Sequence, residues 1–357
     1  MFTIIFVVAS IALLILAHEA AHFVTAKLFN MKVEEFGFGF PPRMFAWRPV
    51  NKKTGVPSET EYSFNWLPFG GFVRIAGEND PALSGVPIEE TFSAEDRTRI
   101  FMFQPAWKRA VVTVAGVGMN FVLGWLLLSF ILMLGSPAVL VVSGIQPGSP
   151  AASVGLAAGD VIQEFSRAQD FISFVNTHRG ESIALHIIRG GKELEINAVP
   201  RRETGKDEGA LGVFLAEGGQ PRLGFFSALK EGMVSTFAIA QLTLLGFWQL
   251  LTNLFGHARL LTGVVGPIGI VSVAVETGKI GFVYVLQLIA FISVNLAVMN
   301  LIPFPALDGG RLLFLAIEKL KGSPLPQRLE AYANGFGFAF LLVLIILISA
   351  RDVATLL

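Results

Sequence analysis

The sequence A-H-E-A-A-H at positions 17–22 ends an otherwise apolar stretch and carries the pattern H-E-x-x-H. Residues four apart lie on one face of a helix, so His18 and His22 can present two ring nitrogens to one metal ion. Glu19 lies beside them and can take a proton from water, an arrangement typical of zinc hydrolases. The alternative is a polar cluster in a helix bundle. It is disfavoured because ionisable groups in a membrane span each cost about 2.5–3.5 kcal/mol and usually mark function.

The chain before this motif predicts a first transmembrane helix. Residues 1–17 carry no charge, and a helix over 1–27 is long enough to cross a hydrocarbon core of about 30 Å. No basic segment precedes the apolar run, so we expect a retained span and not a signal peptide. The basic residues that follow are Lys27, Lys32, Arg43, Arg48, Lys52 and Lys53. By the positive-inside rule, they predict that the metal motif lies toward the cytoplasmic side of the cell membrane.

The composition also indicates a membrane protein. Of 357 residues, 53% are hydrophobic and only 15% are charged, whereas soluble proteins average about 25% charged residues. The formal net charge is zero, so nothing in the charge balance favours nucleic acid as a partner. The chain has no Cys, which leaves His and carboxylate side chains as the expected protein ligands for zinc.

A β segment is expected after the first span. Between Phe36 and Gly77, alternation of polar and apolar residues is broken by Gly and Pro, which predicts short strands and turns. The segment either dips into the protein interior at membrane depth or forms an ordinary cytoplasmic hairpin. A strand edge can pair with an extended peptide, so the candidate substrate-binding residues here are Tyr62, Phe64, Gly70 and Gly71.

A soluble segment begins near Val139. Its residues 148–162, G-S-P-A-A-S-V-G-L-A-A-G-D-V-I, resemble the PDZ pattern G-S-P-A-x-x-x-G-L-x-x-G-D-x-I. This resemblance implies a β-rich α+β PDZ domain, which we expect to be extracytoplasmic because it follows a second span. PDZ domains bind a peptide or protein partner as an added strand, or can act as a steric plug.

Two uncharged stretches, 232–255 and 280–304, are each long enough to span. If Asp308 shares a metal with His18 and His22, the stretch 280–304 must cross from outside to inside. The stretch 232–255 then cannot cross as well, and we expect it to be an interfacial helix. The prediction is therefore a polytopic α-helical membrane protein with about four transmembrane helices.

The predicted organisation has seven parts, which follow from these patterns. They are a first transmembrane helix (1–27), a cytoplasmic-side β segment with an amphipathic approach (28–109), a second transmembrane helix (110–137), a PDZ domain (138–201), a linker with an interfacial helix (202–279), a third transmembrane helix with an acidic motif (280–322) and a fourth transmembrane helix (323–357).

The second half of the candidate site is N-L-I-P-F-P-A-L-D-G-G at 300–310. Two prolines break the helix at membrane depth, where irregular backbone can line a polar cavity. Asp308 either supplies a third zinc ligand, leaving the fourth position for water, or caps a helix end. In G-V-G-M-N at 116–120, the small residues, Gly116 among them, allow close helix packing, and Asn120 is a candidate substrate-binding residue or a helix–helix contact.

The two halves together resemble the site-2 protease family of intramembrane zinc metalloproteases, of the bacterial regulator-of-sigma-E protease type. The resemblance covers nearly the whole chain and includes P-F-G-G-F at 68–72 and G-P-I-G-I at 266–270. It implies that Asp308 is a zinc ligand and that Asn300 helps to hold substrate. The chain departs from the family at Val117, where Pro is usual, and in having one PDZ domain where some relatives have two. The second departure makes substrate gating harder to transfer.

Our leading hypothesis is an endopeptidase that uses Zn²⁺ to cleave transmembrane segments of single-pass membrane proteins in the lipid bilayer. Its substrates would be membrane-bound anti-sigma factors or signal-peptide remnants. Glu19 would act as the general base, and His18, His22 and Asp308 would hold the metal. The alternative is a non-catalytic membrane scaffold with PDZ peptide binding and a structural metal, which would not need Glu19. A zinc transporter is disfavoured because no inverted repeat is visible.

Overall fold

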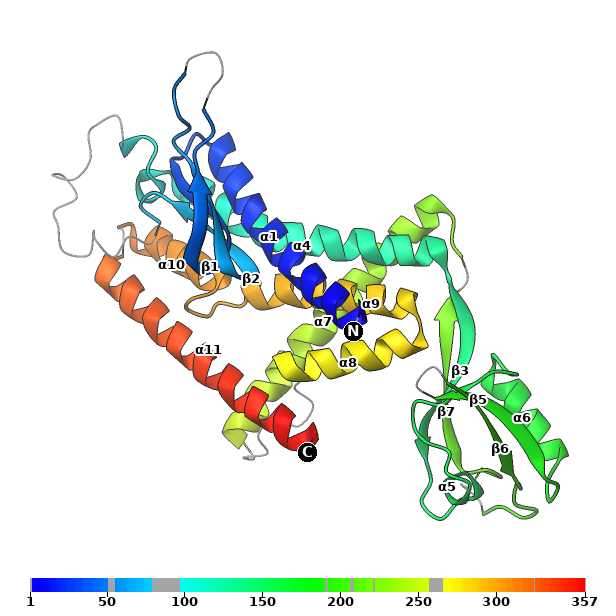
Figure 1. Cartoon of the computed structure of the whole chain (residues 1–357). Helices are drawn as coiled ribbons and strands as arrows, with labels where there is room; N and C mark the ends of the chain where they lie inside the picture. Colours follow the sequence, from blue (N-terminus) through cyan, green and yellow to red (C-terminus); the bar gives the residue numbers. More distant parts are fainter. Residues whose placement is uncertain are drawn as a thin grey trace. The chain divides into compact units, whose positions relative to one another are not determined.

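The structure is a computed structural model that describes residues 2–50, 55–78, 97–189, 192–205, 209–220, 222–256, 266–323 and 325–356. The elements in chain order are α1 (Phe2–Leu28), β1 (Val33–Trp47), β2 (Glu61–Ile75), η2 (Phe101–Phe103), α4 (Ala106–Leu134), β3 (Ser136–Ile145), α5 (Pro150–Ser153), β4 (Val161–Ile162), α6 (Ala168–Thr177), β5 (Ile183–Arg189), β6 (Lys192–Ala198), β7 (Val213–Gln220), α7 (Phe225–Gly256), α8 (Pro267–Ile280), α9 (Phe282–Leu301), α10 (Asp308–Lys321) and α11 (Gln327–Leu356) (Figure 1). Lys52, Lys53 and most of the polar stretch after Gly77 lie outside the described residues.

The chain divides into two compact units. The helical unit comprises Met1–Leu128, Met233–Ala274 and Gln287–Leu357, and the β unit comprises Ser129–Gly232 and Val275–Leu286. The candidate site lies in the helical unit, and the segment expected to be a PDZ domain lies in the β unit.

The helices confirm a polytopic membrane protein but exceed the predicted number of spans. Five described helices are long and apolar enough to cross a membrane: Phe2–Leu28, Ala106–Leu134, Phe225–Leu250, Phe282–Leu301 and Arg328–Ala354. The expectation of about four is therefore low by one on this criterion. The additional helix is α7. It begins at Phe225, before the uncharged stretch 232–255 that was expected to form an interfacial helix.

Chain direction bears on whether α7 crosses the membrane. The next helix, α8, has only 14 residues, which is about 21 Å of helix and short of a core of about 30 Å. If Asp308 shares a metal with His18 and His22, α9 must begin on the outer side of the membrane. A complete crossing by α7 would leave the chain on the inner side, and α8 with its flanking residues would have to carry it back across before α9 begins. An interfacial position for α7 therefore stays a prediction.

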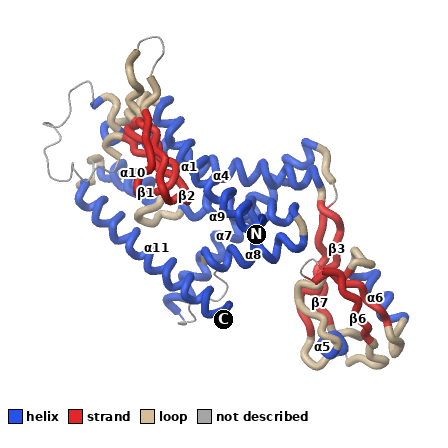
Figure 2. The backbone as a smooth tube through the Cα atoms, in the orientation of Figure 1, coloured by secondary structure: helices blue, strands red, loops and turns tan. Residues whose placement is uncertain are grey.

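The strands expected after α1 are confirmed as a two-element sheet of β1 and β2, which lies along α1 (Figure 2). Both elements are long and bend back on themselves, so Phe36 pairs with both Val73 and Tyr62. Tyr62 pairs in turn with Trp47 on its other side. Residues 62–64 therefore have a β1 partner on each side, whereas residues 71–75 have a β1 partner on one side only.

A small apolar core fixes α1, the sheet and α4 against one another. It contains Ala26 from α1, Val33 from β1, Ile75 from β2 and Val112 from α4, together with Met31. Four of these side chains are completely inaccessible to solvent, namely Ala26, Met31, Val33 and Val112. This packing holds the helix that carries H-E-x-x-H between the β2 edge and α4.

The β unit contains a five-stranded antiparallel sheet with strand order β6-β5-β4-β3-β7. Its core combines strand residues such as Leu140, Leu185 and Ile187 with Phe171 of α6. The predicted boundary of this domain at residue 201 is too early, because β7 pairs with β3 along its length. Polar and glycine residues between 201 and 220 suggested a linker, but Val213 and Leu215 alternate into the core as a strand requires.

Candidate metal centre

The first two candidate ligands project from adjacent turns of α1. Both imidazoles are buried, with 6% of each residue exposed. The Nε2 atoms of His18 and His22 are 3.1 Å apart, and the rings meet edge to face. The four-residue spacing therefore places two ring nitrogens at one point, as the sequence predicts.

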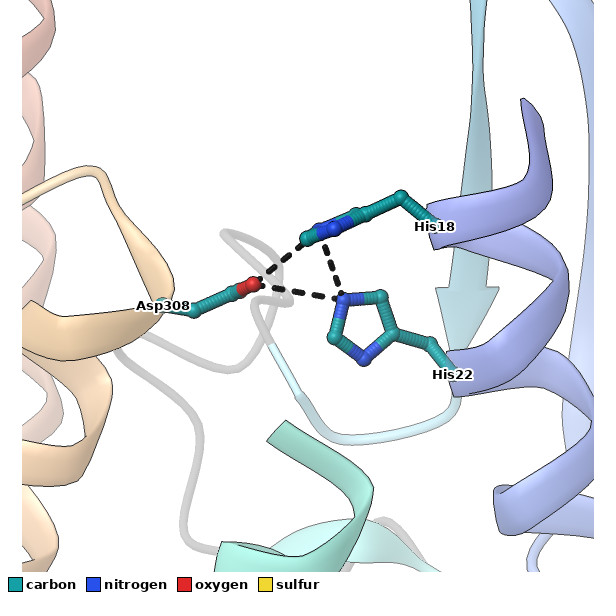
Figure 3. A group of neighbouring side chains, drawn as sticks. All are labelled: His18, His22 and Asp308. Atoms are coloured by element: carbon teal, nitrogen blue, oxygen red, sulfur yellow. Dashed lines mark hydrogen bonds and ion pairs between the residues drawn. The ribbon is translucent and has the colours of Figure 1, made fainter. Parts of the chain in front are cut away.

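The third candidate ligand arrives from the beginning of α10. Asp308 is the first residue of this helix, and its Oδ2 lies 3.0 Å from His18 Nε2 and 3.4 Å from His22 Nε2 (Figure 3). Glycine is required at the next two positions because the chain turns back closely on itself. A Cβ at Gly309 would lie 2.2 Å from the Ile302 carbonyl oxygen, and one at Gly310 would lie 2.3 Å from that of Phe304.

The three atoms fit a zinc ion. Ligands about 2.0–2.1 Å from a tetrahedral zinc ion lie about 3.3 Å from one another, close to the observed 3.0, 3.1 and 3.4 Å. Asp308 Oδ2 is buried and forms no hydrogen bond of acceptable geometry with any described residue, despite its short distance to His18. This is expected of an atom aimed at a point shared with both imidazoles and not at an N–H group. The described part of the chain adds no fourth His or carboxylate to the cluster, which is typical of catalytic zinc sites.

A glycine on α4 leaves space beside the two imidazoles. A Cβ at Gly116 would lie 2.3 Å from His22 Nε2 and 2.7 Å from His18 Nε2. Any side chain here would occupy the point where the two nitrogens converge. Sequence reasoning treated Gly116 only as a small residue for helix packing, because nothing in the local sequence shows which helix it faces.

The charge of Asp308 suits a ligand. Burial raises the pKa of the Asp308 carboxyl, but the adjacent imidazoles of His18 and His22 outweigh burial and hold this pKa well below its usual range. The carboxyl group is therefore ionised at neutral pH. A charge network that sequence reasoning missed lies next to it: Arg311, one turn along α10, donates through Nη1 to Glu78 Oε1 at 2.6 Å.

Glu19 faces the β2 edge. Its Oε2 accepts a hydrogen bond from the backbone N–H of Val73 at 3.1 Å. Gly71, two residues earlier on the same edge, would place a Cβ 3.9 Å from Glu19 Cγ and 2.9 Å from the Gly37 carbonyl oxygen. The candidate general base thus lies between the metal centre and a strand whose outer edge has no strand partner among the described residues.

The other predicted site residues lie in different environments. Tyr62 and Phe64 belong to an aromatic ladder, in which Phe64 stacks on Phe38 and Phe45. Asn120 is buried against His18, with its Nδ2 3.4 Å from His18 Nδ1. Asn300 lies half-buried in the last turn of α9.

Comparison with known proteins places these features in one family. The profile of Peptidase family M50 matches residues 6–344. A relative from Clostridium perfringens, whose name places it among the zinc metalloproteases, is 33% identical over 98% of this chain and 98% of its own length. The zinc metalloprotease RasP of Geobacillus kaustophilus is 29% identical over 95% of each chain. The regulator of sigma-W protease RasP of Bacillus subtilis is 27% identical over 98% of each.

Proposed function

This chain belongs to peptidase family M50 and is a zinc-dependent intramembrane endopeptidase, and we propose that His18, His22 and Asp308 hold its zinc ion. The observation that carries this assignment is the convergence of two Nε2 atoms and one carboxylate oxygen, all within 4.8 Å of one another. The space beside Gly116 and the unsatisfied Asp308 oxygen support it independently.

Glu19 is the proposed general base. When bound, zinc acts as a Lewis acid toward water and the scissile carbonyl group. Glu19 takes the proton of the attacking water and delivers it to the leaving amine, the two proton transfers that peptide hydrolysis needs. It is adjacent to His18 in sequence but is not part of the ligand cluster, so it is free to carry a proton.

The substrate is proposed to bind in extended form along residues 71–73 of β2. The backbone carbonyl groups of a helical substrate are occupied by hydrogen bonds within the helix. Unwinding this helix in lipid leaves backbone groups unpaired at a cost of several kcal/mol each. The outer edge of β2 offers partners for them. The earlier candidates Tyr62 and Phe64 are less suited to this task because their backbone is already paired on both sides. Gly70 and Gly71 remain candidates, and Asn300 is a further candidate for holding the substrate backbone.

Strand addition would also release the general base. The Val73 N–H that an added strand would use is the group that donates to Glu19. A substrate carbonyl taking this hydrogen bond leaves the Glu19 carboxylate without its resting partner. Substrate docking and base activation are thereby linked through one backbone group.

The proposed setting is the cell membrane, with the metal centre toward the cytoplasm. Lys27 lies in the last turn of α1, and Lys32, Arg43 and Arg48 follow this helix. Arg311, Lys319 and Lys321 belong to α10, so both ligand-bearing ends carry basic residues. The β unit is then extracytoplasmic, and its match to the PDZ pattern supports peptide or protein binding there. The proposed substrate is a single-pass membrane protein. The name of the Bacillus subtilis relative, regulator of sigma-W protease, supports a link between this substrate and a sigma factor.

The assignment is tested by separating zinc retention from proteolysis. Glu19→Gln should retain zinc and lose cleavage of a transmembrane substrate by about 10²–10⁴-fold, since only proton transfer is removed. His22→Ala should lose both zinc and cleavage. Zinc content is measured in purified protein by elemental analysis, and cleavage is measured in liposomes. Full activity in Glu19→Gln would contradict the assigned base.

A further inference from the structure

One face of α4 lies along the His pair of α1. Val112, Gly116 and Asn120 are spaced four residues apart and therefore share this face. Val112 contacts His22, Gly116 faces both rings, and Asn120 contacts His18. The contacting residues thus run in opposite directions along the two helices. His22 contacts the earlier residue of α4, Val112, and His18 contacts the later one, Asn120.

The contact to His22 fixes the role of its two nitrogens. His22 Nδ1 lies 2.8 Å from the backbone carbonyl oxygen of Val112, which can only accept a hydrogen bond. Nδ1 must therefore carry the proton, and Nε2 keeps its lone pair on the side that faces Asp308. A histidine that binds metal usually donates its other N–H to such an acceptor.

Among the described residues, no backbone carbonyl is hydrogen-bonded to His18 Nδ1. Its Nε2 faces Asp308 at 3.0 Å, so its Nδ1 must be the protonated nitrogen if Nε2 binds the metal. The group next to Nδ1 is the amide of Asn120, at 3.4 Å. Asn120 is 1% exposed, and its Oδ1 is buried with no hydrogen-bond partner in the described chain.

Rotating the Asn120 amide by half a turn accounts both for the unpartnered Oδ1 and for the amide nitrogen placed next to a protonated His18 Nδ1. Amide oxygen and nitrogen are nearly equal in size, so their assignment follows from the hydrogen bonds they make. The rotation places Oδ1 beside His18 Nδ1–H, giving the oxygen a donor and the imidazole an acceptor. Ser293 of α9 holds the backbone at this point, since its Oγ donates to the Asn120 carbonyl oxygen at 2.8 Å.

We infer that Asn120 is a positioning residue for the metal centre, whose amide oxygen fixes the tautomer and orientation of His18. This inference rests on the proposed zinc ligands. It gives Asn120 a role distinct from the substrate binding expected from sequence. It also makes α4 the element that orients both imidazoles, through a backbone carbonyl at one and a side chain at the other.

The test uses full-length protein in detergent, with Zn²⁺ and Co²⁺ as probes. Asn120→Leu keeps the shape but has no acceptor, and Asn120→Asp restores one. The matched control is Thr113→Val on the same helix. Thr113 is equally buried, at 1% exposed, but its Oγ1 bonds within the helix to the Arg109 carbonyl oxygen. Zinc affinity is measured by competition with a chelator, and the Co²⁺ visible spectrum reports the ligand geometry.

Asn120→Leu should weaken zinc binding about 10–100-fold and alter the Co²⁺ spectrum, as loss of a group that supports a ligand does. Asn120→Asp should recover most of the affinity, and Thr113→Val should match the wild type. The inference is overturned if Asn120→Leu binds both metals as the wild type does and only the KM for substrate rises. The proposed ligands themselves are contradicted if His18→Ala leaves zinc affinity unchanged, so failure of the ligand assignment and failure of the Asn120 inference are read from different variants.

Discussion

Asp308 of the helical unit and Asp160 of the β unit both place a carboxylate oxygen out of solvent beside a basic neighbour, yet their surroundings differ. Asp160 is completely inaccessible to solvent. Arg189 donates one hydrogen bond to each of its carboxylate oxygens, from Nε and Nη2, at 2.7 Å each. Its Oδ2 also accepts the Ala157 N–H at 2.8 Å. Asp308 leaves Oδ2 without a hydrogen bond among the described residues. A satisfied buried charge holds a turn together, whereas an unsatisfied one among imidazoles is poised for an ion.

Removing each carboxylate should separate the two roles most strongly. Asp308→Ala removes a proposed ligand, so zinc affinity should fall by more than about 100-fold, beyond what loss of a supporting group costs. Cleavage should disappear with it, while hydrogen exchange in the β unit stays unchanged. Chelator competition and exchange mass spectrometry measure the two effects. Zinc affinity equal to the wild type would remove Asp308 from the site.

Filling the space opposite Asp308 tests the same point without changing a ligand. The Cβ introduced by Gly116→Ala meets both Nε2 atoms, so we expect zinc affinity to fall by about 100-fold, at the upper end for a change beside the ligands. Gly118→Ala is the matched control, because a Cβ at Gly118 meets no atom within 4 Å. Normal zinc binding in Gly116→Ala would show that the ion lies elsewhere.

Neutralising Asp160 should affect stability and not chemistry. Asp160→Asn keeps an acceptor for Ala157 but loses the charge that pairs with Arg189, whose side chain is 39% exposed. We expect local destabilisation of the β unit by about 1–3 kcal/mol, the cost of an imperfectly satisfied buried group. Faster hydrogen exchange in β4 and β5 would report it. Loss of zinc from the site in this variant would contradict the separation of the two roles.

An exposed pair in the β unit should give the smallest effect. Glu164 accepts from His186 Nδ1 and raises the pKa of that imidazole. A histidine pKa that is raised in the folded state adds stability at low pH, and this contribution is lost as pH rises through the raised value. Relative to the intrinsic exchange rate at each pH, hydrogen exchange in β5 should therefore quicken slightly between acidic and neutral pH. The change should be absent in His186→Gln, and an equal change in that variant would assign it to another group.

The sequence by itself determined the chemistry of the site and the class of the fold. The helical period places His18 and His22 on one face wherever a helix forms, and uncharged runs of sufficient length predict spans. The pairing of H-E-x-x-H with the acidic motif at Asp308 also followed, through the resemblance to a known family. These features depend only on the spacing of residues along the chain, which can be read directly from the sequence.

Only the tertiary structure decided which distant groups meet. The sequence did not show that Gly116 leaves space beside the two imidazoles, that Asn120 faces His18, or that β7 completes the sheet of the β unit. Of the residues predicted for the substrate edge, the fold pairs Tyr62 and Phe64 on both sides and leaves Gly71 with a partner on one side. Strand order and helix contacts depend on how remote apolar surfaces pack against each other. A single sequence shows that such surfaces exist but not which of them pair.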